Sequence, residues 1–378
     1  MKKKYPLFDI YWDNEDVQWV TDVIKRGSYW ATGPEIKKFE VDLADFFKVK
    51  YVATFNSGTS ALHAILLAYN ITQGEVIVPS MCFISTANCV LLVGSKPIFA
   101  EIEDKTLGLD PEDVNNKITE KTRAIIPMHY GGMTCRHIKI LKEIAEDNNL
   151  VLIEDNAESL GAEIEGKMAG TIGDAGMLSF CQNKIITTGE GGAICTNDEE
   201  IYKKLLLIRS HGRVEHPGSD YFSNIKESEY IQIGYNYRLP TMSAALGIAQ
   251  LKKVNEIIKL RRKIGKYYDE KLSKNPNLEI FGELSGFKNV YQLYSVLLKD
   301  FNKKEELQDF LLKEGIFTKV YFYPIHLKSF YRETFGYKEG DLPITEKLSK
   351  RILTLPISLR FENEDQNYII KKVAEFFK

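Results

Sequence analysis

The sequence predicts an α/β fold, in which a mainly parallel sheet is covered by helices on both faces. Between Tyr51 and about Thr196, short β-rich runs alternate with segments of helical length. Most of these runs are apolar throughout, which is typical of strands buried on both faces, as in parallel sheets. The runs occupy residues 51–55, 75–79, 96–101, 123–127, 150–154, 176–180 and 192–196.

A smaller region follows the predicted sheet. Residues 239–273 have a helical pattern, which ends before the turn Asn275-Pro-Asn277. Beyond the turn, a β-rich run at 290–298 precedes a helix over about 303–314 and a C-terminal helix that begins near 363. We therefore expect a large domain with an N-terminal arm over residues 1–250 and a small C-terminal α/β domain over residues 251–378.

The composition argues against several classes of function. Fifty basic and fifty-two acidic side chains leave a net charge of -2, so no overall field would hold the chain on nucleic acid or an anionic membrane. The five cysteines show no CxxC pair or zinc-ligand spacing, which favours a reducing compartment and no metal site. No export signal is visible, and no apolar run approaches the roughly 20 residues that cross a bilayer. We expect a cytoplasmic protein that binds no nucleic acid, membrane or metal.

Polar residues that follow the predicted strands are candidates for a site, because ligands of open α/β sheets bind outside the carboxyl ends of the strands. The first such segment is Asn56-Ser57-Gly58-Thr59-Ser60, which opens a helix. Backbone N–H groups and small hydroxyls at a helix N-terminus can bind a phosphate, and Gly58 would let the anion approach closely. An ordinary helix cap by Ser57 or Thr59 is the alternative.

Two further segments carry ionisable side chains. Asp155 ends an apolar strand, where its carboxylate could hold a protonated ring nitrogen or could simply cap a helix. Lys184 lies between the 176–180 run and a glycine-rich turn. Most lysines are solvated, but its apolar and small neighbours favour the partly desolvated amine that Schiff-base chemistry requires. The GxGxxG and GxxxxGK[ST] patterns are absent, so neither a dinucleotide loop nor a Walker loop is predicted.

Together these segments resemble the DegT/DnrJ/EryC1/StrS family of sugar aminotransferases, over nearly the whole chain. Each matching motif is weak alone, but their joint occurrence in this order is specific. The motifs include Trp30-Ala-Thr-Gly-Pro34, Ser57-Gly-Thr-Ser-Ala-Leu62, Pro79-Ser-Met-Cys-Phe83, Glu154-Asp-Asn-Ala-Glu158, Asn183-Lys-Ile-Ile-Thr-Thr-Gly189, Gly234-Tyr-Asn-Tyr-Arg238 and Tyr323-Pro-Ile-His326.

The resemblance implies the aspartate-aminotransferase fold, which is fold type I of the enzymes that use pyridoxal 5'-phosphate (PLP). Lys184 would hold PLP as a Schiff base and then move protons between substrate and cofactor. Asp155 would keep the ring nitrogen protonated so that the ring can accept electrons, and Phe83 would stack on the ring. The family forms homodimers, and it places active sites at the subunit interface.

The resemblance also assigns the cofactor phosphate and the substrate. Asn236 would reach the phosphate from the neighbouring subunit. The phosphate ligands within the chain would be Gly58, Thr59, Ser60 and Ser179. His326 and Tyr323 are candidates for contact with the sugar or its diphosphate, although a packed or surface histidine is the alternative. We expect His129 and His211 to be structural.

One residue departs from the family pattern. The family often has Gln or His three residues after the aspartate, whereas this chain has Glu158. Because the side chain would lie beside the phenolic oxygen of the cofactor, two adjacent anions would repel. We therefore expect Glu158 to be protonated or to share a proton with that oxygen.

The reaction implied by the resemblance is amino transfer from glutamate to a nucleotide-linked keto sugar. The run 183–189 resembles members that aminate carbon 4 of a 4-keto-6-deoxy sugar, to make an amino-deoxy sugar for a surface polysaccharide or glycan. Amination at carbon 3 and another fold type I reaction are the alternatives within catalysis. A PLP-binding sensor or regulator without turnover is the alternative of another class. Lys184 argues against the sugar dehydratases of the family, in which histidine replaces the lysine.

Overall fold

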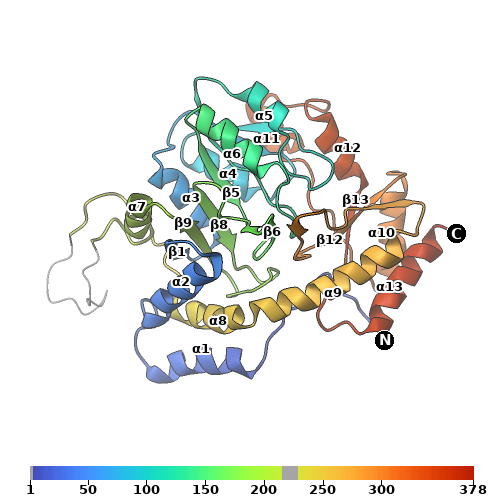
Figure 1. Cartoon of the computed structure of the whole chain (residues 1–378), viewed down its shortest axis with the longest axis horizontal. Coiled ribbons are helices and arrows are strands. Elements are labelled where there is room, and N and C mark those ends of the chain that lie inside the picture. The colour runs from blue at the N-terminus through green and yellow to red at the C-terminus, as the bar shows by residue number, and fades with distance from the viewer. Residues whose placement is uncertain (1–2, 215–228) are drawn as a thin grey trace.

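In the computed structural model of the protein, which describes residues 3–214 and 229–378, a seven-stranded sheet lies at the centre (Figure 1). Its strand order is β1-β9-β8-β5-β4-β2-β3. Neighbouring strands from β8 to β3 are parallel, whereas β9 runs antiparallel to both β1 and β8. The α/β prediction is confirmed, and each predicted run overlaps one strand. The strands are β1 (Tyr51–Phe55), β2 (Glu75–Pro79), β3 (Lys96–Ala100), β4 (Thr122–Ile125), β5 (Val151–Asp155), β8 (Ala175–Ser179) and β9 (Gly192–Thr196).

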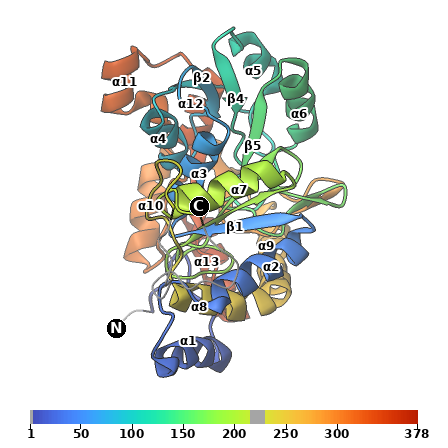
Figure 2. The same cartoon turned by 90° about the vertical axis from the view of Figure 1, so that its left-hand side faces the viewer.

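Helices cover both faces of this sheet (Figure 2). Successive residues of a strand point to opposite faces, so Ala53 and Met177 join one apolar cluster while Val52 and Leu178 join another. Both faces are therefore buried, which explains the continuous apolar runs. The first face is covered by α3 (Gly58–Ala68), α4 (Ser85–Leu92) and α7 (Glu199–Arg209), and the second by α2 (Pro34–Phe47), α5 (Pro111–Lys117), α6 (Ile138–Asp147) and α8 (Thr241–Lys252), with α1 (Asn14–Arg26) packed outside α8.

A three-stranded antiparallel sheet forms the centre of the C-terminal region. Its strands are β10 (Leu278–Ile280), β12 (Tyr294–Leu298) and β13 (Ile352–Leu355), and they pack with α9 (Val254–Leu272), α10 (Lys303–Lys313) and α13 (Asn363–Phe376). The shorter elements are β6 (Glu163–Ile164), β7 (Lys167–Met168), β11 (Phe287–Lys288), η1 (Ile325–Leu327), α11 (Ser329–Phe335) and α12 (Pro343–Arg351).

The boundary between two domains near residue 251 stays a prediction. Helix α9 contributes Ile258 to an apolar cluster of the large sheet and Tyr268 to the cluster of the small sheet. The two regions therefore share one helix at the predicted boundary.

Two local predictions differ from the structure. The helical segment 239–273 is interrupted at Lys253, whose ammonium group is bound by Asp13 and Asp16 of the N-terminal part of the chain. In the run 290–298 only β12 is a strand, because the preceding residues turn to pair with the backbone of Gly131 and Gly132. Both differences come from partners that are distant in sequence.

No helix in residues 3–214 and 229–378 combines the length and the apolar character needed to cross a membrane.

The contact between α2 and α8 depends on a glycine, and this generates a first prediction. A Cβ atom added to Gly247 would lie 2.6 Å from Cζ of the fully buried Phe39 ring. Inside a helix, Gly→Ala ordinarily stabilises by about 0.8–1 kcal/mol. We expect Gly247→Ala to lower the free energy of urea-induced unfolding instead, by about 1–3 kcal/mol, because the core is overpacked.

The same experiment contains its own control. Phe39→Leu makes room at this contact, so the double variant should lose less stability than the sum of the two single losses. Strict additivity, or a stabilised Gly247→Ala protein, would contradict the close packing of these helices.

Candidate active site

Three loops that follow strands meet at one edge of the central sheet. β1, β5 and β8 run in the same direction, so Asn56, Asp155 and Ser179 lie at their carboxyl ends. The loop that carries Lys184 connects β8 to the start of β9 at this same edge. The topology therefore brings together the segments that the sequence marked as candidates.

Asp155 is a buried carboxylate at the end of β5. Its side chain is held by Thr86 of α4, whose hydroxyl donates to Oδ2 over 2.7 Å, and by the backbone N–H of Ala157, which donates to Oδ1 over 3.1 Å. Burial raises the pKa of Asp155, and these hydrogen bonds and the charge of Lys184 oppose the shift. Such a carboxylate is ionised most readily beside a cation.

Thr86 was not found from the sequence. It lies 69 residues from Asp155, in a helix with ordinary composition, and no local pattern distinguishes it from a hydroxyl that packs in a core. The only sequence signal is its place three residues after Phe83, where the family-like motif Pro79–Phe83 ends.

Lys184 and Glu158 form the second polar pair of the site. The Lys184 amine lies 3.6 Å from Oε1 of Glu158, and the backbone N–H of Gly131 donates to Oε2 over 3.1 Å. Burial raises the pKa of Glu158, while the charge of Lys184 and the Gly131 hydrogen bond oppose the shift. The direction is the one that a protonated or proton-sharing Glu158 requires. That role stays a prediction.

The predicted phosphate ligands gather at the start of α3. Gly58 lies against Ser179, because a Cβ atom added to Gly58 would be 3.1 Å from Cβ of Ser179. Thr59 is exposed at this helix end. The Ser60 hydroxyl lies 2.6 Å from Oδ1 of Asn56 and forms a capping box with Ser57, and its contact with a phosphate stays a prediction. Ser57 and Ser60 therefore cap the helix. Thr59 takes no part in this capping box, and its exposed hydroxyl can bind an anion.

Asn236 lies in an exposed loop that contacts this helix end in the same chain. The side-chain amide of Asn56 donates to the backbone oxygen of Asn236 over 3.3 Å, and the backbone N–H of Asn56 donates to Tyr237 over 2.8 Å. The Asn236 side chain is thus presented at the surface near the start of α3. Its reach into a neighbouring subunit stays a prediction.

Aromatic side chains are exposed near the same edge. Phe83, which is 56% exposed, lies one turn before Thr86 and has its ring centroid 6.2 Å from that of Phe322. A ring with this exposure is free to stack on a ligand. Tyr323 is half-exposed, and the ammonium groups of Lys304 and Lys328 lie 5.6 and 4.9 Å from its ring centroid. Its substrate contact stays a prediction.

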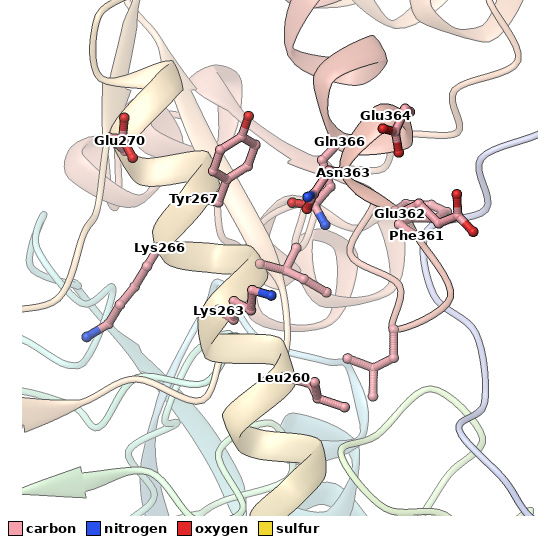
Figure 3. A pocket seen from close by; sticks show the side chains of 12 residues that line it. Leu260, Lys263, Lys266, Tyr267, Glu270, Phe361, Glu362, Asn363, Glu364 and Gln366 are labelled. Carbon is pink, nitrogen blue, oxygen red and sulfur yellow. The ribbon is translucent and has the colours of Figure 1, made fainter.

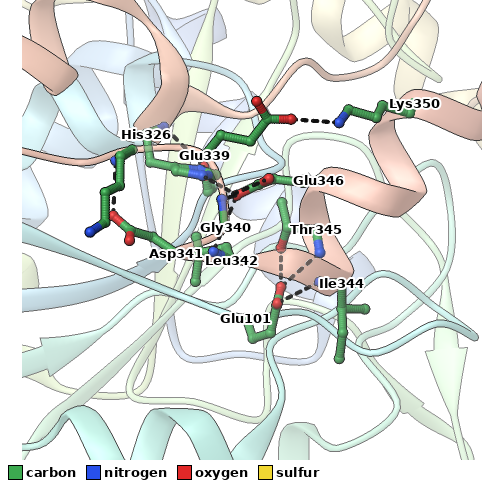
Figure 4. A network of polar contacts seen from close by, with 12 residues as sticks. Glu101, His326, Glu339, Gly340, Asp341, Leu342, Ile344, Thr345, Glu346 and Lys350 are labelled. Atoms are coloured by element: carbon green, nitrogen blue, oxygen red, sulfur yellow. Dashed lines mark hydrogen bonds and ion pairs between the residues drawn. The ribbon is translucent and has the colours of Figure 1, made fainter.

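His326 does not face the site. The ring is fully buried, with Nδ1 2.7 Å from Oγ of Ser80 and Nε2 3.1 Å from Oε1 of Glu346 (Figure 4). Burial lowers the pKa of His326. Because both ring nitrogens are engaged within the protein, the expected contact with the sugar or diphosphate is not supported, and His326 links η1 to the end of β2 and to α12.

The carboxylates around His326 bind backbone groups of the C-terminal region. Glu346 accepts hydrogen bonds from the N–H groups of Gly340 and Leu342, and Glu101, which directly follows β3, accepts from those of Ile344 and Thr345 (Figure 4). The start of α12 is therefore capped by a side chain of the large sheet.

The other two histidines of interest differ in burial. His129 is fully buried, with Nε2 2.7 Å from Oε2 of Glu154 and with Nδ1 accepting from the N–H of Cys135. This geometry agrees with a structural role. His211 is exposed and has a positive φ of 63° in the turn after α7.

A hollow of about 600 Å³ lies elsewhere, between α9 and the start of α13. Figure 3 shows Lys263 and Tyr267 of α9 on one side, with Asn363 and Gln366 on the other. None of the predicted site residues lines it. The candidate active site is therefore the polar edge of the central sheet and not this hollow.

Comparison with known proteins identifies the family. The sequence profile of the DegT/DnrJ/EryC1/StrS aminotransferase family matches residues 11–374. The chain belongs to this family. It is an aminotransferase, and its fold is fold type I of the PLP-dependent enzymes, as predicted.

Relatives of known name match this aminotransferase over nearly its whole length. The chain is 35% identical to GDP-perosamine synthase of Vibrio cholerae, with 93% of each chain covered. It is 31% identical to UDP-4-amino-4,6-dideoxy-N-acetyl-beta-L-altrosamine transaminase of Campylobacter jejuni, covering 94% of this chain and 93% of the relative. Among solved structures, Helicobacter pylori PseC, an aminotransferase involved in the biosynthesis of pseudoaminic acid, has a TM-score of 0.92 at 30% identity, with 99% of each chain covered.

The residues at the sheet edge fit PLP. The buried Asp155 carboxylate suits a protonated pyridine nitrogen, which would supply the cation that favours its ionised form. Lys184 would supply the amine, and Phe83 would supply an exposed ring. The start of α3 offers backbone N–H groups and the Thr59 hydroxyl to a phosphate, as helix N-termini do in other proteins.

The raised pKa of Glu158 generates the second prediction. Between its unfolded pKa of about 4.3 and its higher folded pKa, the folded state binds more protons, so this group makes stability fall as pH rises. Gln does not titrate. In ligand-free protein, the unfolding free energy of Glu158→Gln minus that of wild type should therefore increase as pH rises through this window.

Urea unfolding at fixed ionic strength over a pH series measures this difference. Glu143→Gln, on an exposed position of α6, is the matched control for the loss of one carboxylate. A Glu158→Gln difference that does not change with pH would show that burial leaves this carboxyl unperturbed.

Proposed function

We propose that this aminotransferase moves an amino group from glutamate to a nucleotide-linked keto sugar, at carbon 4 of a 4-keto-6-deoxy sugar, with PLP bound to Lys184. The observation that carries the proposal is the Lys184 amine at the carboxyl edge of the sheet, 3.6 Å from the buried Glu158. The product would be an amino-deoxy sugar for a surface polysaccharide or glycan.

Each polar residue of the edge has a part in this reaction. PLP, when bound, would supply an electron sink for the substrate carbon and a carrier for the amino group. Asp155 holds a proton at the ring nitrogen, and Thr86 fixes the direction of its carboxylate. The Lys184 amine, which is free of the cofactor while a substrate is bound there, would remove a proton from the carbon of the amino donor and return a proton to the carbon of the acceptor. Glu158 holds a proton beside Lys184. This proton prevents repulsion between the Glu158 carboxylate and the phenolic oxygen of the cofactor.

The names of the relatives support the substrate class. The Vibrio cholerae enzyme is named for a GDP sugar and the Campylobacter jejuni enzyme for a UDP-linked 4-amino-4,6-dideoxy sugar. The names of these two relatives contain different nucleotides, so together they support a nucleotide-linked sugar but not one particular nucleotide. The name of the Campylobacter jejuni enzyme supports amination at carbon 4.

The third prediction tests this function directly. Purified protein with PLP and glutamate is incubated with a panel of GDP-, UDP- and dTDP-linked keto sugars, and 2-oxoglutarate and the aminated sugar are measured. We expect one class of 4-keto-6-deoxy sugar to give both products. Lys184→Ala should abolish turnover and the absorbance of lysine-bound PLP, because the amine supplies both the bond and the proton transfer.

Other outcomes of the panel assign other functions. Amination at carbon 3 would overturn the proposed carbon. PLP binding without 2-oxoglutarate from any sugar would favour a sensor or regulator. Full activity in Lys184→Ala would show that another group performs the transfer, and Lys167→Ala, at an exposed lysine on β7, controls for the loss of one amine.

We also propose that the protein is a homodimer in which Asn236 completes the partner's phosphate site, and this gives the fourth prediction. Asn236→Ala and Lys184→Ala would then damage different halves of one composite site. Mixing the two inactive variants should restore up to roughly a quarter of the activity, because half of randomly formed dimers are mixed and each carries one intact site.

The mixing experiment needs differently tagged chains to demonstrate subunit exchange. Recovery of activity supports the shared site. If exchange is demonstrated, Asn236→Ala is impaired and no activity returns, then Asn236 acts within its own chain, beside Asn56.

A further inference from the structure

A short segment of the C-terminal region lies against both loops of the Lys184–Glu158 pair. We call this segment, residues 289–293, the strap. It precedes β12 and has an irregular shape: Tyr291 has a positive φ of 50°, and its backbone N–H donates to the side chain of Asn289 over 2.7 Å. Polar contacts within the strap therefore hold its turn.

On one side, the strap holds the loop that binds Glu158. The backbone N–H groups of Val290 and Leu293 donate to the oxygens of Gly132 and Gly131, both over 3.0 Å. The N–H of Gly131 in turn donates to Glu158. Gly132 has a φ of 106°, and a Cβ atom there would lie 2.7 Å from two backbone nitrogens of the strap. Only glycine permits so close an approach in this conformation.

On the other side, the strap holds the turn of Lys184. Gln292 is 3% exposed, and its side-chain Nε2 donates over 2.5 Å to the backbone oxygen of Asn183, the residue before Lys184. The N–H of Lys184 donates to Cys181, which closes the turn. The strap therefore contacts both Asn183, which precedes Lys184, and Gly131, which donates to Glu158.

The strap is itself anchored by a buried guanidinium group. Arg261 of α9 is 4% exposed, and it donates from Nε to the oxygen of Tyr291 over 2.9 Å and from Nη2 to that of Gln292 over 2.8 Å. The position of the strap thus depends on the helix that joins the two regions of the chain.

We propose that Gln292 is a positioning residue that sets where the Lys184 amine stands relative to Glu158. This role rests on the proposed function of Lys184. The side-chain amide fixes the carbonyl before Lys184, and the same strap fixes Gly131, so the 3.6 Å between amine and carboxylate is set from both sides. Proton transfer at a substrate carbon requires such placement, and an error of 1 Å can cost on the order of 100-fold in rate.

The test uses two buried glutamines with the same chemistry. Gln292→Met keeps the length of the side chain and removes the donor. Gln250→Met is the control, because Gln250 is 2% exposed and its Nε2 donates to the backbone oxygen of Tyr11 and to Oδ1 of Asp16, both away from the site. The control variant loses at least as many buried hydrogen bonds as Gln292→Met, but only Gln292→Met loses the contact with the Lys184 turn.

The first readout needs no cofactor. Ligand-free protein is labelled briefly with acetic anhydride, and acetylation of Lys184 relative to the exposed Lys167 is measured by peptide mass spectrometry. Gln292→Met should raise the labelling of Lys184 by roughly two- to tenfold, the factor that corresponds to the net free energy of one hydrogen bond. Gln250→Met should leave it unchanged. Unchanged labelling in Gln292→Met would overturn the proposal, whatever reaction the protein catalyses.

The second readout is the split between kcat and KM in the PLP-loaded enzyme. Gln292→Met should lower kcat on the order of 10- to 100-fold with little change in either KM, because the amine is misplaced while binding is intact. Equal losses in Gln292→Met and Gln250→Met would show a general structural effect and overturn the proposal. If Gln292→Met does not fold, Gln292→Leu, which also removes the donor and adds no ionisable group, is measured in its place with the same criteria.

Discussion

The site depends on keeping one amine and two carboxylates in a place from which water is largely excluded. Asp155 and Glu158 are 2% and 3% exposed, and an unpaired charge at such positions costs several kcal/mol. Each carboxylate is therefore held by specific donors, Thr86 and Ala157 for the first and Gly131 for the second. These donors come from α4 and from the loops after β4 and β5, so the elements of the sheet edge must be correctly placed before the charges are tolerated.

The backbone at this edge is held by hydrogen bonds from two sides. Asp155 exchanges backbone hydrogen bonds with the segment after β4, because its N–H donates to Pro127 and its oxygen accepts from His129. The sheet pairing thus continues past the formal end of β4. The neighbouring carboxylate of Glu154 points to the opposite face of the sheet. It accepts hydrogen bonds from the backbone N–H groups of Gly170, Ile172 and Gly173, so the end of β5 is also held from that face.

The strands of the central sheet could be predicted from the sequence, and so could the candidate residues at the edge of the sheet. Strands buried on both faces leave continuous apolar runs, and these could be read locally. Lys184, Asp155 and the start of α3 stood out because their unusual neighbours are close in the chain. Thr86, Gln292 and Arg261 could not be found in this way, since their partners lie far away in sequence and their own surroundings are ordinary. These contacts are set by packing, which a local pattern does not encode.

Two further residues show what a local pattern leaves open. The pattern Tyr323-Pro-Ile-His326 marks a bend, but it does not reveal that the imidazole turns inward to Ser80 and Glu346. Ser60 fits a phosphate loop, and a capping box with Ser57 uses the same hydroxyl, so its contact with a phosphate stays a prediction. In both cases the residue type suits two roles, and a local pattern does not distinguish between them.

The cap that Glu101 places on α12 has a consequence for biosynthesis. Glu101 leaves the ribosome more than two hundred residues before Ile344 and Thr345, the groups that its carboxylate binds in the finished protein. Ser80 is likewise synthesised more than two hundred residues before His326, its hydrogen-bond partner. During translation, the β2–β3 end of the sheet therefore presents polar groups whose final partners have not yet been synthesised, and incompletely folded chains of this kind are in general prone to aggregation. The last third of the chain therefore provides hydrogen-bond partners for the end of the large sheet, in addition to forming its own sheet.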